Sequence, residues 1–383
     1  MTRVYIVAGE ESGDVLGARL MLALRAIEPG VVFLGLGGPR MQALGFESIF
    51  PMRELAVMGL LEVLPKIVQL RARLRQTAAA VVARRPDVLV TIDSPGFTLR
   101  LLKLVKSSKI KRVHLVAPQV WAWREGRVKG FPGLWDRLLC LLPFEPAFFA
   151  RHGLAAEFVG HPVLESGADH GDAARFRARF AIPPGARPLI LMPGSRRSEV
   201  SRLLPIFGAT LDLLRAAFPD LVPVVPVASS VAEAVIAGTL DWAVKPVIVT
   251  TTEDKHDAFA AAAAALTKSG TSTLELALAG VPMVVTYRVN PLTGWLARRL
   301  LTVKHVAIIN ILAGRGVVPE LLQQDCQPQR LAAEVARLLT DSATAMAQRN
   351  VFLSIINSLK PEVGTPSEAV AHAVLAAVRT AAR

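Results

Sequence analysis

Residues 3–14 read RVYIVAGEESGD and contain the pattern that decides the fold. A short apolar run, Arg3 to Ala8, leads through a glycine into acidic and hydroxyl residues that suit the start of a helix at about Asp14. The same order of strand and loop recurs at Val31–Leu36 into a helix at Pro39–Leu44, at Val88–Asp93 into a helix from about Phe97, and at Val113–Ala117 into a loop. Alternation of this kind predicts a parallel sheet.

The pattern breaks between Gly153 and Pro183, where residues 165–172 (ESGADHGD) predict a hinge. It then resumes with strands predicted at Leu189–Met192, Val222–Val227, Val247–Thr250, Ala264–Thr267 and Met283–Thr286, helices from Ser198, after Ser229 and from about Thr271, and amphipathic helices at 328–339 and 367–383. A chain of 383 residues is also long for one core. We therefore expect an α/β protein of two Rossmann-like, doubly wound domains, 1–165 and 166–350, with a helical tail, 351–383, packing back on the amino-terminal domain.

Composition excludes several classes of protein. The longest strictly apolar run, Ala258–Leu266, is about half of the ~18 residues that span a bilayer. The apolar start is too short for a signal peptide, and Cys140 and Cys326 alone form no disulfide framework, so we expect a cytoplasmic protein. No GxGxxG, GxSxG or HExxH pattern is present, which argues against an oxidoreductase, an α/β-hydrolase or a zinc protease. We expect no metal and no cofactor.

The net charge of +13 calls for an anionic partner. Nine basic residues and one acid, Glu125, lie between Arg100 and Lys129, together with Trp121 and Trp123. Phe131 and Trp135 follow. Positive charge mixed with amphipathic aromatic rings favours a lipid headgroup surface, although solvated helix faces and core tryptophans would give the same pattern. No signature of a nucleic-acid-binding motif is present, so nucleic acid is not an expected partner.

Asp93 is the first candidate catalytic residue. It ends the strongly apolar strand that begins at Val88, a position that partly desolvates a carboxylate and raises its proton affinity toward that of a useful base. In doubly wound sheets, ligands bind beyond the carboxyl ends of the strands, where this residue would lie. A helix-capping aspartate would occupy the same position, and the sequence leaves both readings open.

Two loops in the second half suit a nucleotide. Residues 191–199 (LMPGSRRSE) run from a strand through Gly194 and Ser195 into a helix start carrying Arg196 and Glu199, where backbone N–H groups, the helix dipole and an arginine would bind a diphosphate without a metal. Residues 268–275 (KSGTSTLE) form a second such turn, containing Ser269, Gly270, Thr271, Thr273 and Glu275. The loop would donate to phosphate, while Glu275 would accept hydrogen bonds from ribose hydroxyls.

The order and wording of these loops resemble the lipid-A-disaccharide synthase family over nearly the whole chain. The matching motifs are AGEESGD (8–14), VMGLLEVLPK (57–66), IDSP (92–95), PQVWAWREGRV (118–128), LPFE (142–145), GHP (160–162), PGSRRSEV (193–200), SGTSTLELAL (269–278), Tyr287-Arg288 and NILAGRGVVPELLQ (310–323). The resemblance implies the glycosyltransferase-B architecture, with a cleft between the domains. It also implies inverting transfer of diacylglucosamine from UDP-diacylglucosamine to diacylglucosamine 1-phosphate, forming a β-1,6 disaccharide.

Residue roles carried over from the family follow the motifs. The resemblance places Glu10, Ser12 and Asp14 on the acceptor side, Asp93 as the base, Arg196 as the diphosphate clamp, Glu275 at the ribose, and Asn310 and Arg315 in the cleft. The family commonly has an acid and an asparagine after the proline of IDSP, where this chain has Gly96, Phe97 and Thr98. That departure leaves Asp93 as the only carboxylate of its loop.

Two alternatives to this function stay open at the level of sequence. Another UDP-sugar enzyme of this fold, such as an epimerase or the muramyl-pathway transferase, would share the nucleotide loops. A non-catalytic lipid- or nucleotide-binding relative would share the whole fold. We expect peripheral binding to the inner face of the cytoplasmic membrane, through the apolar run 57–64, the basic residues that follow it and the segment 100–129, and the sequence also allows a homo-oligomer.

Overall fold

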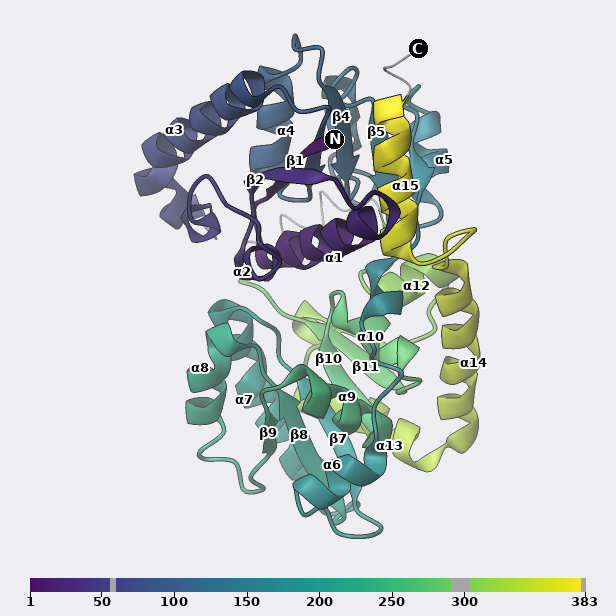
Figure 1. The fold of residues 1–383 in the computed structure, drawn as a ribbon. Coiled ribbons are helices and arrows are strands. Elements are labelled where there is room, and N and C mark those ends of the chain that lie inside the picture. Colours follow the sequence, from purple (N-terminus) through teal and green to yellow (C-terminus); the bar gives the residue numbers. More distant parts are fainter. Residues whose placement is uncertain (56–59, 291–302, 380–383) are drawn as a thin grey trace. The chain divides into compact units, whose positions relative to one another are not determined.

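A computed structural model describes residues 1–55, 60–290 and 303–379, and describes only the backbone of residues 60–66. The chain divides into two compact units, Met1–Pro162 with Leu359–Arg383, and Val163–Ser358. The predicted boundaries were 165/166 and 350/351. Residues 351–358, placed in the tail by the sequence, complete a helix of the second unit, and only the last helix returns to the first (Figure 1).

The first unit contains a parallel six-stranded sheet in the order β2-β1-β3-β4-β5-β6. Its strands are β1 (Arg3–Ala8), β2 (Val32–Leu36), β3 (Val88–Ile92), β4 (Lys111–Leu115), β5 (Arg137–Cys140) and β6 (Glu157–Phe158). Its helices are α1 (Glu11–Ile27), α2 (Pro39–Gln42), α3 (Leu60–Arg84), α4 (Pro95–Leu104), α5 (Glu145–Ala150) and α15 (Pro366–Arg379), with short 3-10 turns η1 (Met52–Glu54) and η2 (Glu125–Gly130). Every strand pairs in parallel with its neighbours in the sheet.

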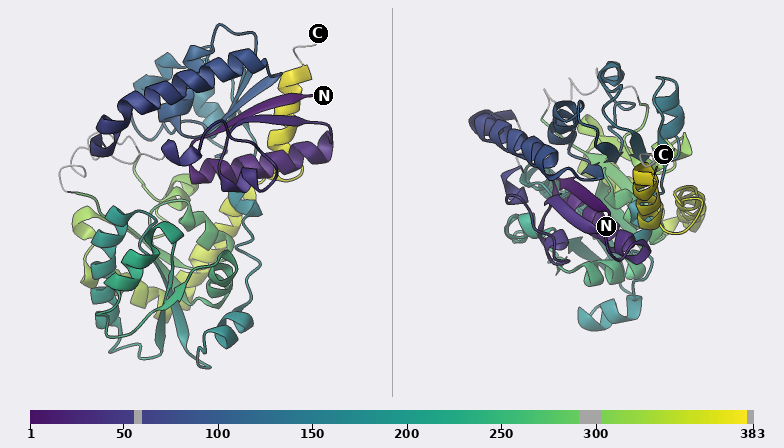
Figure 2. Two further views of the ribbon diagram at one scale, coloured as in Figure 1. Left: turned by 60° about the vertical axis from the view of Figure 1, so that its left-hand side comes forward. Right: turned by 45° about the horizontal axis from the view of Figure 1, so that its top comes forward.

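Both faces of this first sheet are covered, as the apolar central strands β1 and β3 require. On one face, α1 and α15 pack against each other and over residues such as Val4, Ile6 and Val90 (Figures 1 and 2). On the other face, the core includes Leu101 of α4 and Phe149 of α5. The carboxy-terminal helix is therefore an integral layer of the first unit.

The second unit contains a parallel six-stranded sheet in the order β12-β11-β10-β7-β8-β9. Its strands are β7 (Arg187–Met192), β8 (Leu221–Pro226), β9 (Val247–Val249), β10 (Ala264–Lys268), β11 (Met283–Tyr287) and β12 (Glu320–Leu322). Its helices are α6 (Ala173–Arg179), α7 (Arg197–Leu214), α8 (Ala232–Gly238), α9 (Thr252–Ala261), α10 (Ser272–Leu278), α12 (Ile308–Ala313), α13 (Pro328–Thr340) and α14 (Ser342–Ser358), with 3-10 turns η3 (Pro162–Glu165), η4 (Ser229–Val231) and η5 (Gln323–Asp325).

The stretch predicted as a hinge belongs to the second unit, where polar contacts hold it. Asp172 caps α6 by accepting hydrogen bonds from the N–H groups of Ala174 and Arg175, and its own N–H donates to Asp257 at 2.7 Å. The Arg175 guanidinium also binds the buried Asp257 carboxylate. The glycine- and charge-rich stretch therefore leads into a capped helix start. Local sequence did not show this, because Asp257, the residue that fixes the stretch, lies far away in the chain.

Candidate functional site

Strand order places the topological switch point of the first sheet between β1 and β3, which are paired up to Ala8 and Ile92. Ligand crevices of doubly wound sheets form at such a point, beyond the carboxyl ends of the two strands. Glu10 follows β1 and Asp93 follows β3, so the two carboxylates stand at neighbouring strand ends. Ser12 is exposed in the first turn of α1, on the same edge. The structure thus brings Glu10 and Asp93 to neighbouring strand ends, with Ser12 in the helix turn that follows Glu10.

The environment of Asp93 favours a proton acceptor. Burial raises the pKa of its carboxyl above the usual range, the negative charge of Glu10 raises it further, and the N–H of Ser94 opposes both effects. Raised proton affinity at the mouth of a crevice is a property expected of a general base.

The backbone at Asp93 is held in an uncommon conformation. Asp93 and Ser94 both have φ of 46°, a left-handed conformation that costs free energy for residues other than glycine. Two contacts secure it: the Asp93 N–H donates to the carbonyl of Leu115 at 2.9 Å, and the Thr98 hydroxyl donates to the Asp93 carbonyl at 2.6 Å. Thr98, one of the departures from the family pattern, therefore supports the position of the candidate base.

Asp14 has a structural role, and its role as a substrate contact stays a prediction. Its carboxylate is buried and accepts hydrogen bonds from the N–H groups of Gly38 at 2.8 Å, Arg40 at 2.8 Å and Met41 at 3.1 Å. These groups begin α2, whose first amides have no partner within the helix. The helix predicted to start at about Asp14 begins earlier, because α1 starts at Glu11, with no side-chain cap.

The switch point of the second sheet lies between β7 and β10, and both predicted nucleotide loops follow these two strands. After β7, Gly194 has φ of +117°, and a Cβ atom there would lie 2.4 Å from Glu199 Oε2. Glu199 is buried, and its carboxylate accepts a hydrogen bond from the Ser195 N–H at 3.2 Å and pairs with Arg196 Nη1 at 3.1 Å. The Arg196 side chain remains half exposed, at 50%. The buried Glu199 carboxylate thus holds the conformation of this loop.

Lys268 joins the two loops and is not among the site residues predicted from the sequence. Its ammonium, at the end of β10, lies 3.2 Å from Glu199 Oε1 and 5.6 Å from the centre of the Tyr287 ring. The lysine stands beside the predicted loop in sequence, but nothing local indicated that its partner was a buried glutamate after a neighbouring strand. An ammonium at this edge supplies a second positive charge to a site suited to phosphate.

In the loop after β10, some side chains are bonded within the protein and others lie at its outer surface. The Ser269 hydroxyl donates to the Val306 carbonyl at 3.0 Å, and the Thr273 hydroxyl donates to the Gly270 carbonyl at 2.7 Å. Thr271 is exposed, and Glu275 is partly exposed and bound to Lys255 Nζ at 2.9 Å. Ser269 and Thr273 therefore fix the loop, while Gly270, Thr271 and Glu275 form its outer part.

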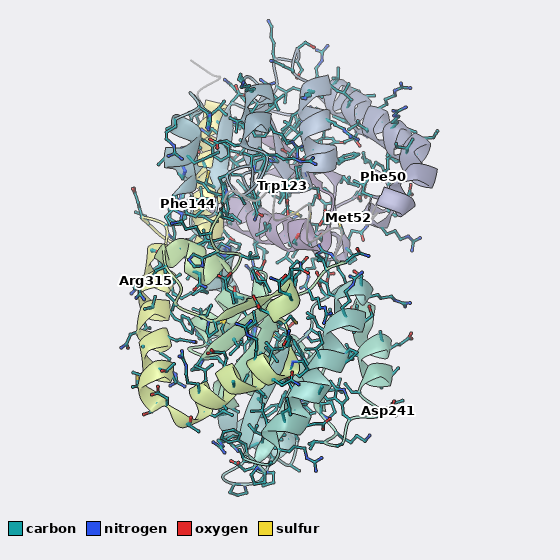
Figure 3. The ribbon with its side chains drawn as sticks, turned by 180° about the vertical axis from the view of Figure 1, so that it is seen from behind. Phe50, Met52, Trp123, Phe144, Asp241 and Arg315 are labelled. Atoms are coloured by element: carbon teal, nitrogen blue, oxygen red, sulfur yellow. The ribbon has the colours of Figure 1, made fainter. Side chains whose placement is uncertain are left out.

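Asn310 is likewise bonded within the protein, and its place in the substrate site stays a prediction. Its side-chain amide is buried, donates to the Val318 carbonyl and to Glu320, and accepts from the N–H groups of Val317 and Val318. All its hydrogen-bonding capacity closes the loop after α12. Arg315, at the tip of that loop, is exposed and makes no ion pair with any residue that the structure describes (Figure 3).

Comparison with known proteins decides the family. The family model described as lipid-A-disaccharide synthetase matches residues 4–374. The chain is 59% identical over 372 residues to a lipid-A-disaccharide synthase of Gluconobacter oxydans, covering 97% of this chain and 90% of that one. It is 56% identical over 383 residues to that of Granulibacter bethesdensis, covering 97% and 98%. The chain belongs to the lipid-A-disaccharide synthase family.

Solved structures confirm the fold of this synthase-family chain. The UDP-GlcNAc 2-epimerase of Neisseria meningitidis, determined with UDP-GlcNAc bound, superposes with a TM-score of 0.67 at 12% identity, covering 98% of this chain and all of that one. The calicheamicin glycosyltransferase superposes with a TM-score of 0.62 at 17% identity, covering both chains fully. Epimerases and transferases share this architecture, so the family match, and not the fold, makes the protein a glycosyltransferase.

The tryptophans of the synthase-family segment 118–135 have separate roles. Trp121 Nε1 donates to the buried Glu145 carboxylate at 3.0 Å, which links the PQVWAWR motif to the LPFE motif. Burial raises the pKa of Glu145 to about 7, against the opposing N–H donors. Trp135 is buried, and Trp123 is 39% exposed (Figure 3). Only Trp123 therefore retains the exposure that membrane contact would require.

The structure describes some of the other expected features. The apolar run 57–64 lies outside the residues whose side chains are described. No helix of the described residues is long and apolar enough to cross a bilayer. Across 1–55, 60–290 and 303–379, no cluster of histidine, cysteine and carboxylate side chains is suited to a metal ion.

Proposed function

We propose that this protein transfers 2,3-diacylglucosamine from UDP-2,3-diacylglucosamine to 2,3-diacylglucosamine 1-phosphate, forming the β-1,6-linked lipid A disaccharide precursor and UDP. The observation that carries the proposal is the family match over residues 4–374. The two switch-point sites support it, since one offers a base and the other offers a phosphate-binding loop.

The acceptor is assigned to the first unit. Asp93 Oδ takes the proton from the 6-hydroxyl of the acceptor as its oxygen attacks C1 of the donor sugar. The new C1–O bond forms as the bond from C1 to the diphosphate breaks, and that electron pair leaves with UDP. Attack from the face opposite UDP inverts the configuration at C1 and gives the β linkage.

The donor is assigned to the second unit. Arg196 and Lys268 supply positive charge, and the N–H groups at the start of α7 supply donors, where negative charge grows on the departing diphosphate. Glu275 accepts from ribose hydroxyls on the opposite loop. Gly194 and Glu199 act indirectly, by holding the first loop in shape.

We further propose that the protein works at the inner face of the cytoplasmic membrane, where acylated substrates reside. Trp123 is exposed with the Arg124 guanidinium over its ring at 5.0 Å, a pairing suited to a headgroup region. Exposed basic residues nearby would add electrostatic attraction to anionic lipid.

The test is UDP release by the purified chain with each lipid alone and with both together. The proposal expects release only with both lipids, together with formation of the disaccharide by mass spectrometry. Asp93→Asn should retain UDP binding and lose at least ~10²-fold in kcat, the lower range for a lost general base. UDP release from the donor alone, with sugar epimerised at C2, would instead support an epimerase, and no turnover with either lipid would support a binding protein.

A further inference from the structure

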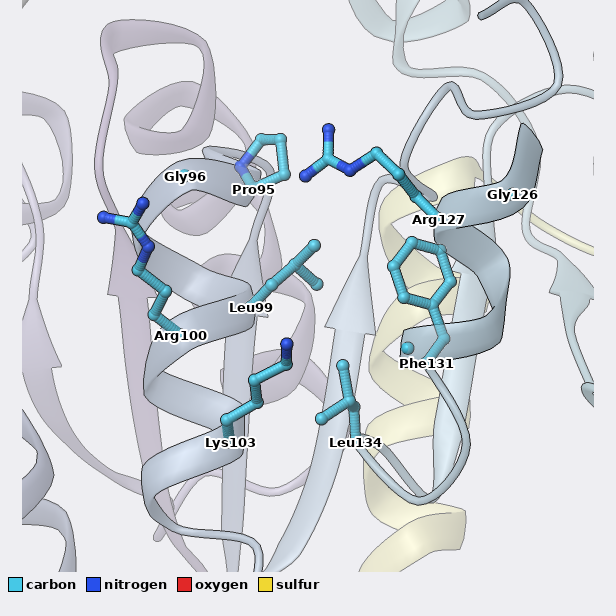
Figure 4. A pocket seen from close by; sticks show the side chains of 10 residues that line it. Pro95, Gly96, Leu99, Arg100, Lys103, Gly126, Arg127, Phe131 and Leu134 are labelled. Atoms are coloured by element: carbon cyan, nitrogen blue, oxygen red, sulfur yellow. The ribbon is translucent and has the colours of Figure 1, made fainter. Parts of the chain in front are cut away.

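A groove of about 410 Å³ lies in the first unit between α4 and the segment containing η2 (Figure 4). Leu99 of α4, with Phe131 and Leu134 from the segment after η2, forms its apolar wall, and all three are buried. Pro95, the first residue of α4, lines one end. A concave site of this size falls in the usual range for small-molecule pockets, ~300–1,000 Å³, and its lining is both apolar and polar.

Three cations surround this apolar wall. Arg100 and Lys103 come from α4, and Arg127 comes from η2. In Figure 4, Arg127 reaches across toward Pro95 and Lys103 rises beside Leu134, while Arg100 stands on the outer side of α4. All three are exposed, and none forms an ion pair with an acid among the described residues.

Four of the six other cations of the same segment are engaged within the protein; the remaining two are Lys109 and Lys129. Lys111 Nζ and Arg112 Nε lie 3.9 and 3.5 Å from Asp136. Lys106 Nζ donates to the Pro132 carbonyl at 3.1 Å, and Arg124 covers the ring of Trp123. The basic run that stood out in the sequence therefore separates into cations engaged within the protein and a smaller set around a groove.

We propose that this groove binds the acceptor of the transfer as an anionic amphiphile, with the phosphate monoester at Arg127 and Lys103 and an acyl chain along Leu99, Phe131 and Leu134. The assignment rests on the proposed function and adds to it the site that recognises the acceptor. Charge complementarity identifies the head, and the apolar wall identifies the chain. Pro95, which lines one end of the groove, is two residues from the candidate base Asp93 in the chain.

Three glycines that line the groove allow its space to be tested by substitution. A Cβ atom built at Gly96, Gly126 or Gly130 meets no atom within 4 Å, and none of the three has a positive φ. All three line the groove. A larger side chain at Gly130 can therefore be accommodated by the backbone while occupying space that an acyl chain would need.

The charge test uses Arg127→Ala and Lys103→Ala with Lys129→Ala as the matched control, since Lys129 is an exposed cation in η2 that does not line the groove. In neutral detergent micelles, with saturating donor, each groove variant should raise the KM for diacylglucosamine 1-phosphate about tenfold, the effect of one charge-assisted contact. The donor KM should stay unchanged. With acceptor lacking the 1-phosphate, the variants and the parent should be equal.

The steric test uses Gly130→Leu. It should lower kcat/KM for acceptors with long acyl chains and leave short-chain acceptors unaffected. Equal sensitivity to both lengths, or a phosphate-independent effect of the charge variants, would overturn the assignment while the parent's activity still supports the proposed function. Absence of disaccharide formation by the parent would instead reject the proposed function.

A third measurement separates the acceptor from membrane phospholipid, which also presents phosphate and acyl chains. Co-sedimentation with phosphatidylglycerol vesicles should be the same for Arg127→Ala, Lys103→Ala, Lys129→Ala and the parent, within about twofold, because one charge of many is removed in each. Selective loss of vesicle binding by the two groove variants, with unchanged acceptor KM, would show a phospholipid site and refute the proposal.

Discussion

Replacing Gly194 by alanine should destabilise the proposed donor loop by more than the free-energy cost of backbone strain alone. At φ of +117°, a non-glycine residue is strained, at a cost of about 1–3 kcal/mol. The new Cβ would also lie 2.4 Å from Glu199 Oε2 and 2.9 Å from Glu199 Cβ. The glutamate must therefore move, and with it the contacts to the Ser195 N–H, Arg196 and Lys268.

Displacing that carboxylate removes hydrogen bonds to charged groups, which contribute about 1.5–3 kcal/mol each. We expect the displaced carboxylate to re-form all but the equivalent of one such bond, which together with backbone strain gives a loss of about 3–6 kcal/mol in the free energy of unfolding of the second unit. The loop that presents Arg196 also loses its shape, so the Kd for UDP should rise at least about tenfold.

Gly185→Ala is the matched control. Gly185 precedes β7, at the opposite end of the same strand, with φ of +82° and no atom within 4 Å of an added Cβ. It should cost about 1–2 kcal/mol of left-handed strain without changing UDP affinity. Urea unfolding followed by circular dichroism gives the stability, and titration calorimetry gives the Kd. Equal stability losses in the two variants, with equal UDP affinity, would refute the assigned role of this loop.

Three further outcomes follow from the two sites. Arg196→Ala should weaken UDP binding as well as turnover, because a phosphate contact exists in the ground state and the transition state alike; unchanged calorimetric affinity would place the nucleotide elsewhere. Since Asp93 must be deprotonated to act and its pKa is raised by burial and by Glu10, kcat/KM should fall as pH drops through that pKa. Glu10→Gln should move this acidic limb to lower pH, and an unmoved limb would exclude Asp93 as the titrating base. Co-sedimentation with anionic vesicles should be salt-sensitive and weaker for Trp123→Ala, whereas equal binding to zwitterionic vesicles would remove the electrostatic contribution.

The sequence by itself was sufficient for nine of the twelve strands that the structure describes and for the loops that carry the candidate chemistry, but it did not predict β5, β6 or β12. Short apolar runs alternating with amphipathic segments specify parallel strands with covering helices, because backbone pairing and burial depend on local pattern. Hence β1, β3, β7 and β10 lie close to their predicted positions. Asp93 at a strand end was identifiable for the same reason.

Only the tertiary structure decided which polar side chains are bonded within the protein. Asp14 and Asn310 looked like contact residues, yet their oxygens and amide groups are bonded to backbone from other loops. Lys268 looked incidental, yet it joins two loops through Glu199. A buried polar group must find a partner, and that partner is set by strand order and crossovers rather than by neighbouring sequence. The same holds for the groove beside α4, where cations and apolar residues separated in the chain become one surface because β3 and β4 pair side by side.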